Sequence, residues 1–441
     1  MVNEMRKEIE KYEKYLLPSI KSRRFYKEKP LMLTNGEGAI LKDIKGNEYI
    51  DLFSMNYIMF LGYKHPEILE TIKRQVDKLI FSVYEFHTEP QLKLAEKLAK
   101  ITPSNLRMSY FLNSGSEAVE CALMISRQYT KKYEIISLYG SYHGKTTYGA
   151  RSATGWSKAK RYIGPMLSGF IKIPWYYCYR CIFKMEYPEC DLLCAKILED
   201  ALKYQGDGSV AAFIVEPILG SAGNIPPPKE YFIEINKILN SNDILFIDDE
   251  ITAGLGRTGR MFAIEHYNVK PDIMTIGKTL GGGLPISATI VDEKIGESLD
   301  SFDYYVTYGG NPLACSVANV VVDLIWNNKL YKRAEKLGNY FIQGLKELSE
   351  RYPLIGDVRG CGLMIGVELV KDVRTKKPAQ EESLYILEKA REKGLILPAG
   401  RGWFKNVIRI NPPVVITEEQ IDKALNIIEE LMREACRRFY R

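Results

Sequence analysis

Residues 245–285 read LFIDDEITAGLGRTGRMFAIEHYNVKPDIMTIGKTLGGGLP, and this stretch contains the pattern from which we infer the fold. An apolar strand is predicted at its start, and this strand ends in three acidic residues, 248–250. A second short strand at 272–276 leads to Lys278 and a run of three glycines. In open α/β sheets, ligands bind beyond the carboxyl ends of the strands. An acid and a lysine at two such ends therefore predict a ligand site.

Asp249 and Lys278 are the two side chains of this stretch with the clearest chemical role. A lysine forms a Schiff base with a cofactor aldehyde, and an aspartate keeps a pyridinium nitrogen protonated, as expected around pyridoxal 5′-phosphate (PLP). The glycines near Lys278 let the backbone pass close to a flat ring. The ordinary alternative is a solvated surface lysine, and the apolar strand and glycine run argue against it.

The stretch resembles the core signature of the class III (ω-type) PLP-dependent aminotransferases, which have fold type I. The shared features are Asp-Glu after an apolar strand, the turn Gly-x-Gly-Arg-Thr-Gly, Pro-Asp, Gly-Lys and Gly-Gly-Gly-x-Pro. The resemblance extends from about Gly36 to Pro413. It implies an α/β fold with a large domain, built on a mostly parallel mixed sheet covered by helices, and a smaller α+β domain.

The domain boundaries that we expect follow from the same resemblance. Residues 1–60 form an N-terminal segment that packs with the small domain, residues 61–325 form the large PLP-binding domain, and residues 326–441 form the small domain. Periodicity predicts a hairpin at 36–52 and mostly helical structure at 66–100. The resemblance implies one long helix at about 313–350 that leads into the small domain, and the pattern from residue 418 onward predicts an amphipathic helix. Residues 1 to about 30 read as an amphipathic helix and a linker.

Gly115 and Ser116 open a predicted helix directly after a short strand. Small residues at a helix start present free N–H groups and the positive end of the helix dipole, which suits a phosphate. An ordinary serine N-cap with a glutamate behind it is the alternative. The resemblance assigns Gly115 and Ser116 to the cofactor phosphate.

The resemblance implies further cofactor contacts. Tyr142 would stack on the pyridine ring, Ile251 would pack on the opposite ring face, and Glu216 would lie near the cofactor. Thr307, in a Thr-x-Gly-Gly-Asn-Pro segment, would bind the phosphate of the neighbouring subunit, so we expect a homodimer or a higher even oligomer with shared active sites. His143 either supports the site or is structural.

Arg409 and Tyr57 are the predicted substrate-binding residues. Arg409 matches the family arginine that clamps a substrate carboxylate as a bidentate pair, and the alternative is a surface arginine on a strand. Arg401 is a second candidate. Tyr57 lies in an aromatic loop that the resemblance places in the substrate pocket, although simple core packing explains this loop equally well.

Two positions depart from the family pattern. Ser221 stands where the ornithine and 4-aminobutyrate branches carry a gating glutamate, which argues against those substrates. Thr252 stands where many members carry a glutamine that bonds the 3-hydroxyl group of the cofactor, so that contact is in doubt.

Four cysteines lie in an insertion at about 175–195 with the spacing C-x2-C-x8-C-x3-C. Four thiolates at such spacing could hold a tetrahedral zinc ion. Disulfides, or an unligated cysteine-bearing loop, are the alternatives. The candidate zinc ligands are Cys178, Cys181, Cys190 and Cys194.

The composition is that of an ordinary globular protein, with 46% hydrophobic and 26% charged residues and a net charge of +6. No basic block is dense enough to predict nucleic-acid binding, and charges interrupt every apolar run before it reaches the length of a membrane span. We expect a cytoplasmic protein that partners neither nucleic acid nor membrane. The abundance of Lys, Glu, Ile and Tyr is typical of a thermophilic source.

The predicted function is PLP-dependent transamination. An amino group would move from an amine, ω-amino acid or amino acid donor to a keto acid, pyruvate or 2-oxoglutarate, with ping-pong kinetics. The alternative is a class III amino-acid racemase or epimerase, which would keep Lys278 and Asp249 but need no keto acid. A distant alternative is a non-catalytic, zinc-containing binding module.

Overall fold

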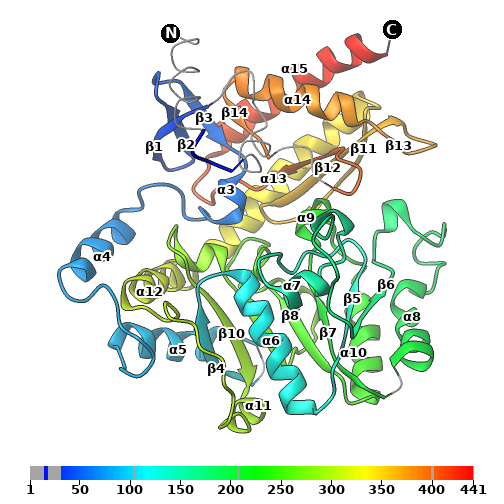
Figure 1. Cartoon of the computed structure of the whole chain (residues 1–441). Coiled ribbons are helices and arrows are strands. Elements are labelled where there is room, and N and C mark those ends of the chain that lie inside the picture. Colours follow the sequence, from blue (N-terminus) through cyan, green and yellow to red (C-terminus); the bar gives the residue numbers. More distant parts are fainter. Residues whose placement is uncertain (1–13, 18–30, 104, 207, 399–401, 441) are drawn as a thin grey trace.

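The computed structural model of the chain describes residues 14–17, 31–103, 105–206, 208–398 and 402–440 (Figure 1). Most of the predicted N-terminal helix, and the candidate Arg401, lie outside these ranges. Among the described residues, no helix is both long enough and apolar enough to cross a membrane.

A seven-stranded sheet forms the centre of the larger half of the molecule (Figure 1). Strand β10 pairs antiparallel with both of its neighbours, and the other neighbouring strands pair in parallel. In spatial order the strands are β4 (Leu106–Leu112), β10 (Ser287–Asp292), β9 (Ile273–Ile276), β8 (Leu245–Asp249), β7 (Val210–Val215), β5 (Glu134–Leu138) and β6 (Phe170–Ile173). The expected mixed, mostly parallel sheet is confirmed.

Helices cover both faces of this sheet, and the sequence of β7 shows why. All its residues are buried, and they alternate between the two faces because side chains in a strand have a period of two. Ala212 and Ile214 share a core with helix α6 (Gly115–Thr130), whereas Phe213 and Val215 share a core with α10 (Tyr231–Ser241). A strand buried on both sides reads as one continuous apolar run.

This half contains further helices, of which α4 packs on α12 and not on the sheet. They are α4 (Pro66–Val76), α5 (Glu89–Ile101), α7 (Tyr148–Ala153), α8 (Leu193–Ala201), α11 (Glu293–Glu297) and α12 (Pro312–Asn327). The predicted helical region 66–100 is thus two helices, with a non-helical connection at 77–88.

Two four-stranded sheets lie beyond the carboxyl edge of the large sheet, with helices α13 (Leu330–Arg351), α14 (Gln380–Glu392) and α15 (Glu418–Phe439) (Figure 1). The first sheet joins β1 (Leu33–Glu37), β2 (Ile40–Asp43), β3 (Glu48–Asp51) and β14 (Leu395–Ile396). The second joins β11 (Ile355–Cys361), β12 (Met364–Asp372), β13 (Lys377–Pro378) and β15 (Val407–Ile410). An N-terminal and a C-terminal segment therefore share one sheet, and the domain division at 60 and 325 stays a proposal.

The prediction of one long helix at 313–350 is wrong. The chain forms α12 and α13, and they are separated at Lys329, which has a left-handed φ of 50°. Helix α12 packs on α4 and α5, whereas α13 packs on β11 and α15. The break allows the two helices to pack against different elements, although their buried side chains belong to one continuous core.

Two glycines allow α13 to approach the loop that follows β8. A Cβ added to Gly338 would overlap the backbone of Gly362, and a Cβ on Gly362 would in turn press on the backbone of Arg257 and Thr258. Three segments that are far apart in the sequence therefore meet backbone to backbone.

We expect Gly338→Ala to lower the free energy of unfolding by about 1–3 kcal/mol, because the added methyl group has no space and the contacting atoms are backbone. Urea denaturation measures this change. Gly164→Ala is the matched control, because nothing lies within 4 Å of a Cβ at Gly164. Equal stability of the two variants would contradict the close approach.

Candidate active site

The predicted catalytic side chains meet at the carboxyl edge of the large sheet. Asp249 ends β8, Glu216 follows β7, Lys278 follows β9, and the segment 142–144 follows β5. Because these strands are parallel neighbours, their carboxyl ends lie at one edge. The structure thus brings together residues that are up to 136 positions apart in the sequence, from Tyr142 to Lys278.

Asp249 and His143 form a buried pair. Asp249 Oδ2 lies 2.7 Å from His143 Nδ1, and both side chains are at most 2% exposed. The other carboxylate oxygen, Oδ1, accepts hydrogen bonds from the Ile251 N–H and the Thr275 hydroxyl. His143 Nε2 is buried without a partner among the described residues. His143 therefore fixes the orientation of Asp249. The sequence alone had left the role of His143 open.

Lys278 opens a short 3₁₀ turn, Lys278–Gly281, with a left-handed φ of 44°. Burial lowers the pKa of its amino group to about 8, although Asp249 and Glu216 act in the opposite direction. A lysine with such a pKa supplies a sizeable fraction of neutral amine near neutral pH, which is the form needed for nucleophilic and proton-transfer chemistry.

Glu216 bridges two loops of the site. Its Oε1 accepts the Tyr142 N–H at 2.8 Å and its Oε2 accepts the Gly220 N–H at 3.0 Å. Burial raises the pKa of Glu216 to about 7. Thr252, the residue that departs from the family pattern, directs its hydroxyl to Glu216 Oε2 at 3.5 Å.

The start of α6 and the loop after β5 form a cradle. Ser116 Oγ accepts the Lys145 N–H at 3.2 Å, and a Cβ on Gly144 would clash with the Ser116 side chain. A Cβ on Gly115 would lie 3.0 Å from Ile251. Ser114 caps the helix in a capping box with Glu117, so the ordinary N-cap that we considered is present as well. The cap and the phosphate assignment do not compete, because they use different residues.

Tyr57 lies in a left-handed turn, Ser54–Tyr57 (α3), whose four residues have φ between 43° and 72°. Each such non-glycine residue costs roughly 1–2 kcal/mol. Local strain of this kind persists where the surrounding structure over-determines it and is concentrated at functional sites. The turn buries the Tyr57 ring, and the Lys278 Nζ lies 5.9 Å from the centre of that ring.

Arg409 lies on β15 and is buried beside Tyr57. Its NH1 group donates to the Tyr57 hydroxyl at 2.7 Å and to the Gly220 carbonyl at 3.1 Å. Its Nε is buried without a partner among the described residues. Arg409 is therefore not a surface arginine.

Sequence reasoning missed Arg257 and Asn224. Arg257 is fully buried over the Tyr57 ring, with 5.5 Å between guanidinium carbon and ring centre, and it donates to three backbone carbonyls. Asn224 accepts the Tyr57 hydroxyl at 2.7 Å. The Gly-Arg-Thr-Gly turn was a signal for Arg257, whereas no local pattern marks Asn224.

Asp248 and Glu250, the other two acids at the end of β8, do not share the contacts of Asp249. Both are buried, and burial raises the pKa of Asp248 well above its usual value and that of Glu250 to about 8. Glu250 accepts the Ile264 N–H at 2.8 Å. Strand alternation therefore leaves Asp249 as the member of the acidic run that contacts His143.

Thr307 and the cysteine cluster lie apart from this group of contacts. Thr307 is exposed, in the turn before α12. All four cysteines of the cluster are free thiols. Within the described part of the chain, no three His, Cys, Asp or Glu side chains are arranged to hold a metal ion. The structure therefore gives the zinc and disulfide hypotheses no direct support.

We expect Tyr57→Phe to weaken pyruvate binding about tenfold, because the Arg409 guanidinium loses the hydroxyl that orients it inside the protein. Titration calorimetry measures this change. Tyr340→Phe is the control, because it removes another hydroxyl of the same half of the molecule, which donates to Asp422 at 2.6 Å on the exposed side of α13. Unchanged pyruvate affinity in Tyr57→Phe would show that the Arg409–Tyr57 bond plays no part in carboxylate binding.

Comparison with known proteins identifies the family. The model of the class-III aminotransferases matches residues 22–432. A leucine/methionine racemase of Thermococcus litoralis is 42% identical over 92% of this chain and 91% of its own length. An acetylornithine aminotransferase of Methanothermobacter thermautotrophicus is 35% identical over 93% of this chain and 95% of its own length.

A solved structure agrees. An amine transaminase from an uncultivated Pseudomonas species, in its PLP-bound form, has a TM-score of 0.88 and 28% identity, and the match covers 93% of this chain and 96% of that one. The residues here fit the same cofactor: an amine of lowered pKa, a buried carboxylate, and a helix that begins with the small residues Gly115 and Ser116 beside the loop after β5. The chain therefore belongs to the class III aminotransferase family, and its cofactor is PLP.

Proposed function

We propose that this protein is an aminotransferase that moves an amino group from an amine, ω-amino acid or amino acid to a keto acid such as pyruvate or 2-oxoglutarate. The observation that carries the proposal is that Lys278, an amine of lowered pKa, lies 5.9 Å from the ring of Tyr57, whose hydroxyl accepts a hydrogen bond from Arg409. A proton carrier and a carboxylate receptor thus share one site.

The protein side of the reaction follows from these residues. When bound, PLP supplies an electron sink for negative charge at the carbon next to the transferred nitrogen. Lys278, in its neutral form, would take the proton from that substrate carbon as a general base and would later give it back as a general acid. Asp249, held by His143, would keep the ring nitrogen of the cofactor protonated. Gly115 and Ser116 would hold its phosphate, and Tyr142 and Ile251 would contact its ring.

Arg409 selects acids. Because the Tyr57 hydroxyl and the Gly220 carbonyl already occupy NH1, the Nε edge of the guanidinium is the side on which a substrate carboxylate binds. Ser221 lies in the short turn Gly220–Gly223 (α9), at the place of the gating glutamate of the ornithine and 4-aminobutyrate branches. The absence of that glutamate argues against ornithine and 4-aminobutyrate as substrates.

Racemisation or epimerisation of an amino acid is the second candidate. The observation that favours it is the 42% identity to the leucine/methionine racemase, which exceeds the 35% identity to the acetylornithine aminotransferase. This reaction uses Lys278, Asp249 and Arg409 in the same roles, but it returns the proton to the substrate carbon and needs no keto acid.

We propose a homodimer in which Thr307 reaches the phosphate site of the neighbouring subunit. Large apolar side chains are exposed beside Thr307 on both the 79–86 and the 305–308 segments, and the rings of Phe81 and Tyr308 are 5.2 Å apart. Exposed apolar patches of this kind are typical of protein–protein contacts. The exposed members are Leu79, Ile80, Phe81, Phe86, Tyr305 and Tyr308.

Product analysis separates the two reactions. We expect L-alanine and L-leucine to yield keto acids in amounts equal to the enzyme when no acceptor is present, and to turn over repeatedly once 2-oxoglutarate is added, because the amino group stays on the cofactor until an acceptor takes it. Chiral chromatography of the same mixtures detects D-amino acids. Lys278→Ala is the control for both reactions.

Accumulation of D-leucine without 2-oxoglutarate would replace transamination by racemisation as the function. Absence of both products, from an enzyme that carries the cofactor absorbance, would overturn both candidates for these donors.

We expect Asp249→Asn to lower kcat by about 10²–10³-fold, because a neutral amide no longer stabilises the protonated ring nitrogen. His143→Asn should lower kcat less and should shift the pH titration of the cofactor absorbance in the same direction as Asp249→Asn, because it acts only through Asp249. Asp272→Asn is the control, because Asp272 accepts the Phe246 N–H at 2.8 Å near the other end of the neighbouring strand. A pH titration that Asp249→Asn leaves unchanged would contradict the assigned contact.

A further inference from the structure

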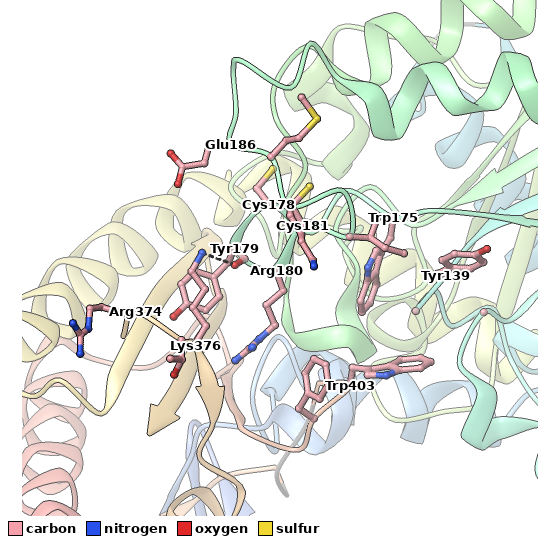
Figure 2. Close-up of a pocket in the computed structure, with 17 residues that line it drawn as sticks. Tyr139, Trp175, Cys178, Tyr179, Arg180, Cys181, Glu186, Arg374, Lys376 and Trp403 are labelled. Atoms are coloured by element: carbon pink, nitrogen blue, oxygen red, sulfur yellow. Dashed lines mark hydrogen bonds between the residues drawn. The ribbon is translucent and has the colours of Figure 1, made fainter. Parts of the chain in front are cut away.

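We propose that a second cavity, distinct from the PLP site, binds a small ligand that combines a flat ring with an anionic group. The cavity has a volume of about 870 Å³. It lies between the cysteine-bearing segment, the turn between β12 and β13, and residues 403–404 (Figure 2). None of the residues that we assign to the cofactor or the substrate lines it.

Aromatic rings form one side of the cavity. Figure 2 shows Trp175 and Trp403 one above the other, and their rings are 5.8 Å apart at an angle of 71°. The Trp175 ring fills the space in which a Cβ of Gly140 would stand, so it is fixed in place. Tyr139 and Phe404 extend the same wall. Rigid aromatic walls bind flat apolar groups by stacking.

Four cations also line the cavity. Arg180, Lys184, Arg374 and Lys376 line it, together with a single carboxylate, Glu186. Arg374 and Lys376 come from the turn between β12 and β13, opposite the tryptophans, with Arg180 between the two sides (Figure 2). Four cations against one acid favour an anionic ligand.

Arg180 is the residue that points most clearly to a ligand. Its Nε donates to Glu368, and its guanidinium lies 5.1 Å from the centre of the Phe404 ring. Its NH2 group is buried without a partner among the described residues. A buried N–H of a charged group is normally hydrogen-bonded. The positive charge of this guanidinium, beside the cavity, therefore favours a carboxylate or phosphate there.

Glu368 fixes the position of the Arg180 side chain. The carboxylate is fully buried, and it also accepts from the Tyr177 hydroxyl and from Arg359 NH1, the latter at 2.7 Å. Burial acts to raise the pKa of Glu368. The charges of Arg359 and Arg180 and the hydrogen bonds to Glu368 together outweigh this effect, so the pKa of Glu368 lies below its usual value. The arginine is therefore fixed before any ligand arrives, and preorganisation of this kind increases affinity.

The size of the cavity indicates the class of ligand. Its volume falls within the range of about 300–1,000 Å³ that is typical of small-molecule sites. An aromatic carboxylate and an aromatic phosphate ester such as a nucleotide share the required chemistry, a flat ring with an anion. The test distinguishes the two.

The experiment is titration calorimetry of the PLP-loaded enzyme with 2-naphthoate and, separately, with AMP. We expect saturable binding of at least one of them, and no comparable binding of uncharged 2-naphthamide or of inorganic phosphate alone. The double variant Arg374→Gln/Lys376→Gln should weaken binding about tenfold, because it removes two of the four cations. Lys377→Gln is the matched control, because Lys377 is exposed beside the cavity but does not line it.

Trp403→Leu tests the aromatic wall and should also weaken binding of the same ligand. The absorbance of bound PLP, followed in parallel, should not change, which separates this cavity from the site at Lys278. Absence of saturable binding for both ligands, equal binding by the double variant and Lys377→Gln, or binding that shifts the PLP absorbance would each overturn the proposal. None of these readouts depends on which reaction the enzyme catalyses.

Discussion

The active site depends on one constraint: the ionisable side chains at the carboxyl edge of the large sheet are buried, so their hydrogen-bond partners must come from the protein itself. Asp249 is held by His143 at 2.7 Å, and Glu216 is held by two backbone N–H groups. Burying a charge is costly unless it is paired or hydrogen-bonded. Each partner therefore has a fixed place, and Lys278 takes its lowered pKa from the same environment.

Tyr57 joins the two halves of the molecule at this site. It lies in a left-handed turn next to the first small sheet, its hydroxyl contacts Asn224 and Arg409, and its ring lies beside Lys278 and Arg257. One side chain thus links the end of the large sheet to β15 of the second small sheet. The strain of the turn is offset by the contacts that it creates.

Glu368 makes a second link between the halves, away from the cofactor. Its carboxylate accepts hydrogen bonds from Tyr177 and Arg180 of the cysteine-bearing segment and from Arg359 of β11. Its own strand, β12, pairs with β15, where Gly366 lies opposite Arg409. The proposed ligand cavity and the carboxylate receptor are therefore built on the same pair of strands.

The sequence by itself determined the fold class, the family and the cofactor, because the ordered motifs around Asp249 and Lys278 are local and their spacing is dictated by strand and turn lengths. It also named Arg409 and Tyr57, but it left core packing open for Tyr57 and a surface strand open for Arg409. Only the tertiary structure placed His143 on Asp249, brought Arg257 and Asn224 to Tyr57, and divided the predicted helix 313–350 at Lys329. Such contacts join residues that are far apart in the chain. They depend on which buried polar groups become hydrogen-bond partners in the folded protein, and no local sequence pattern contains this information.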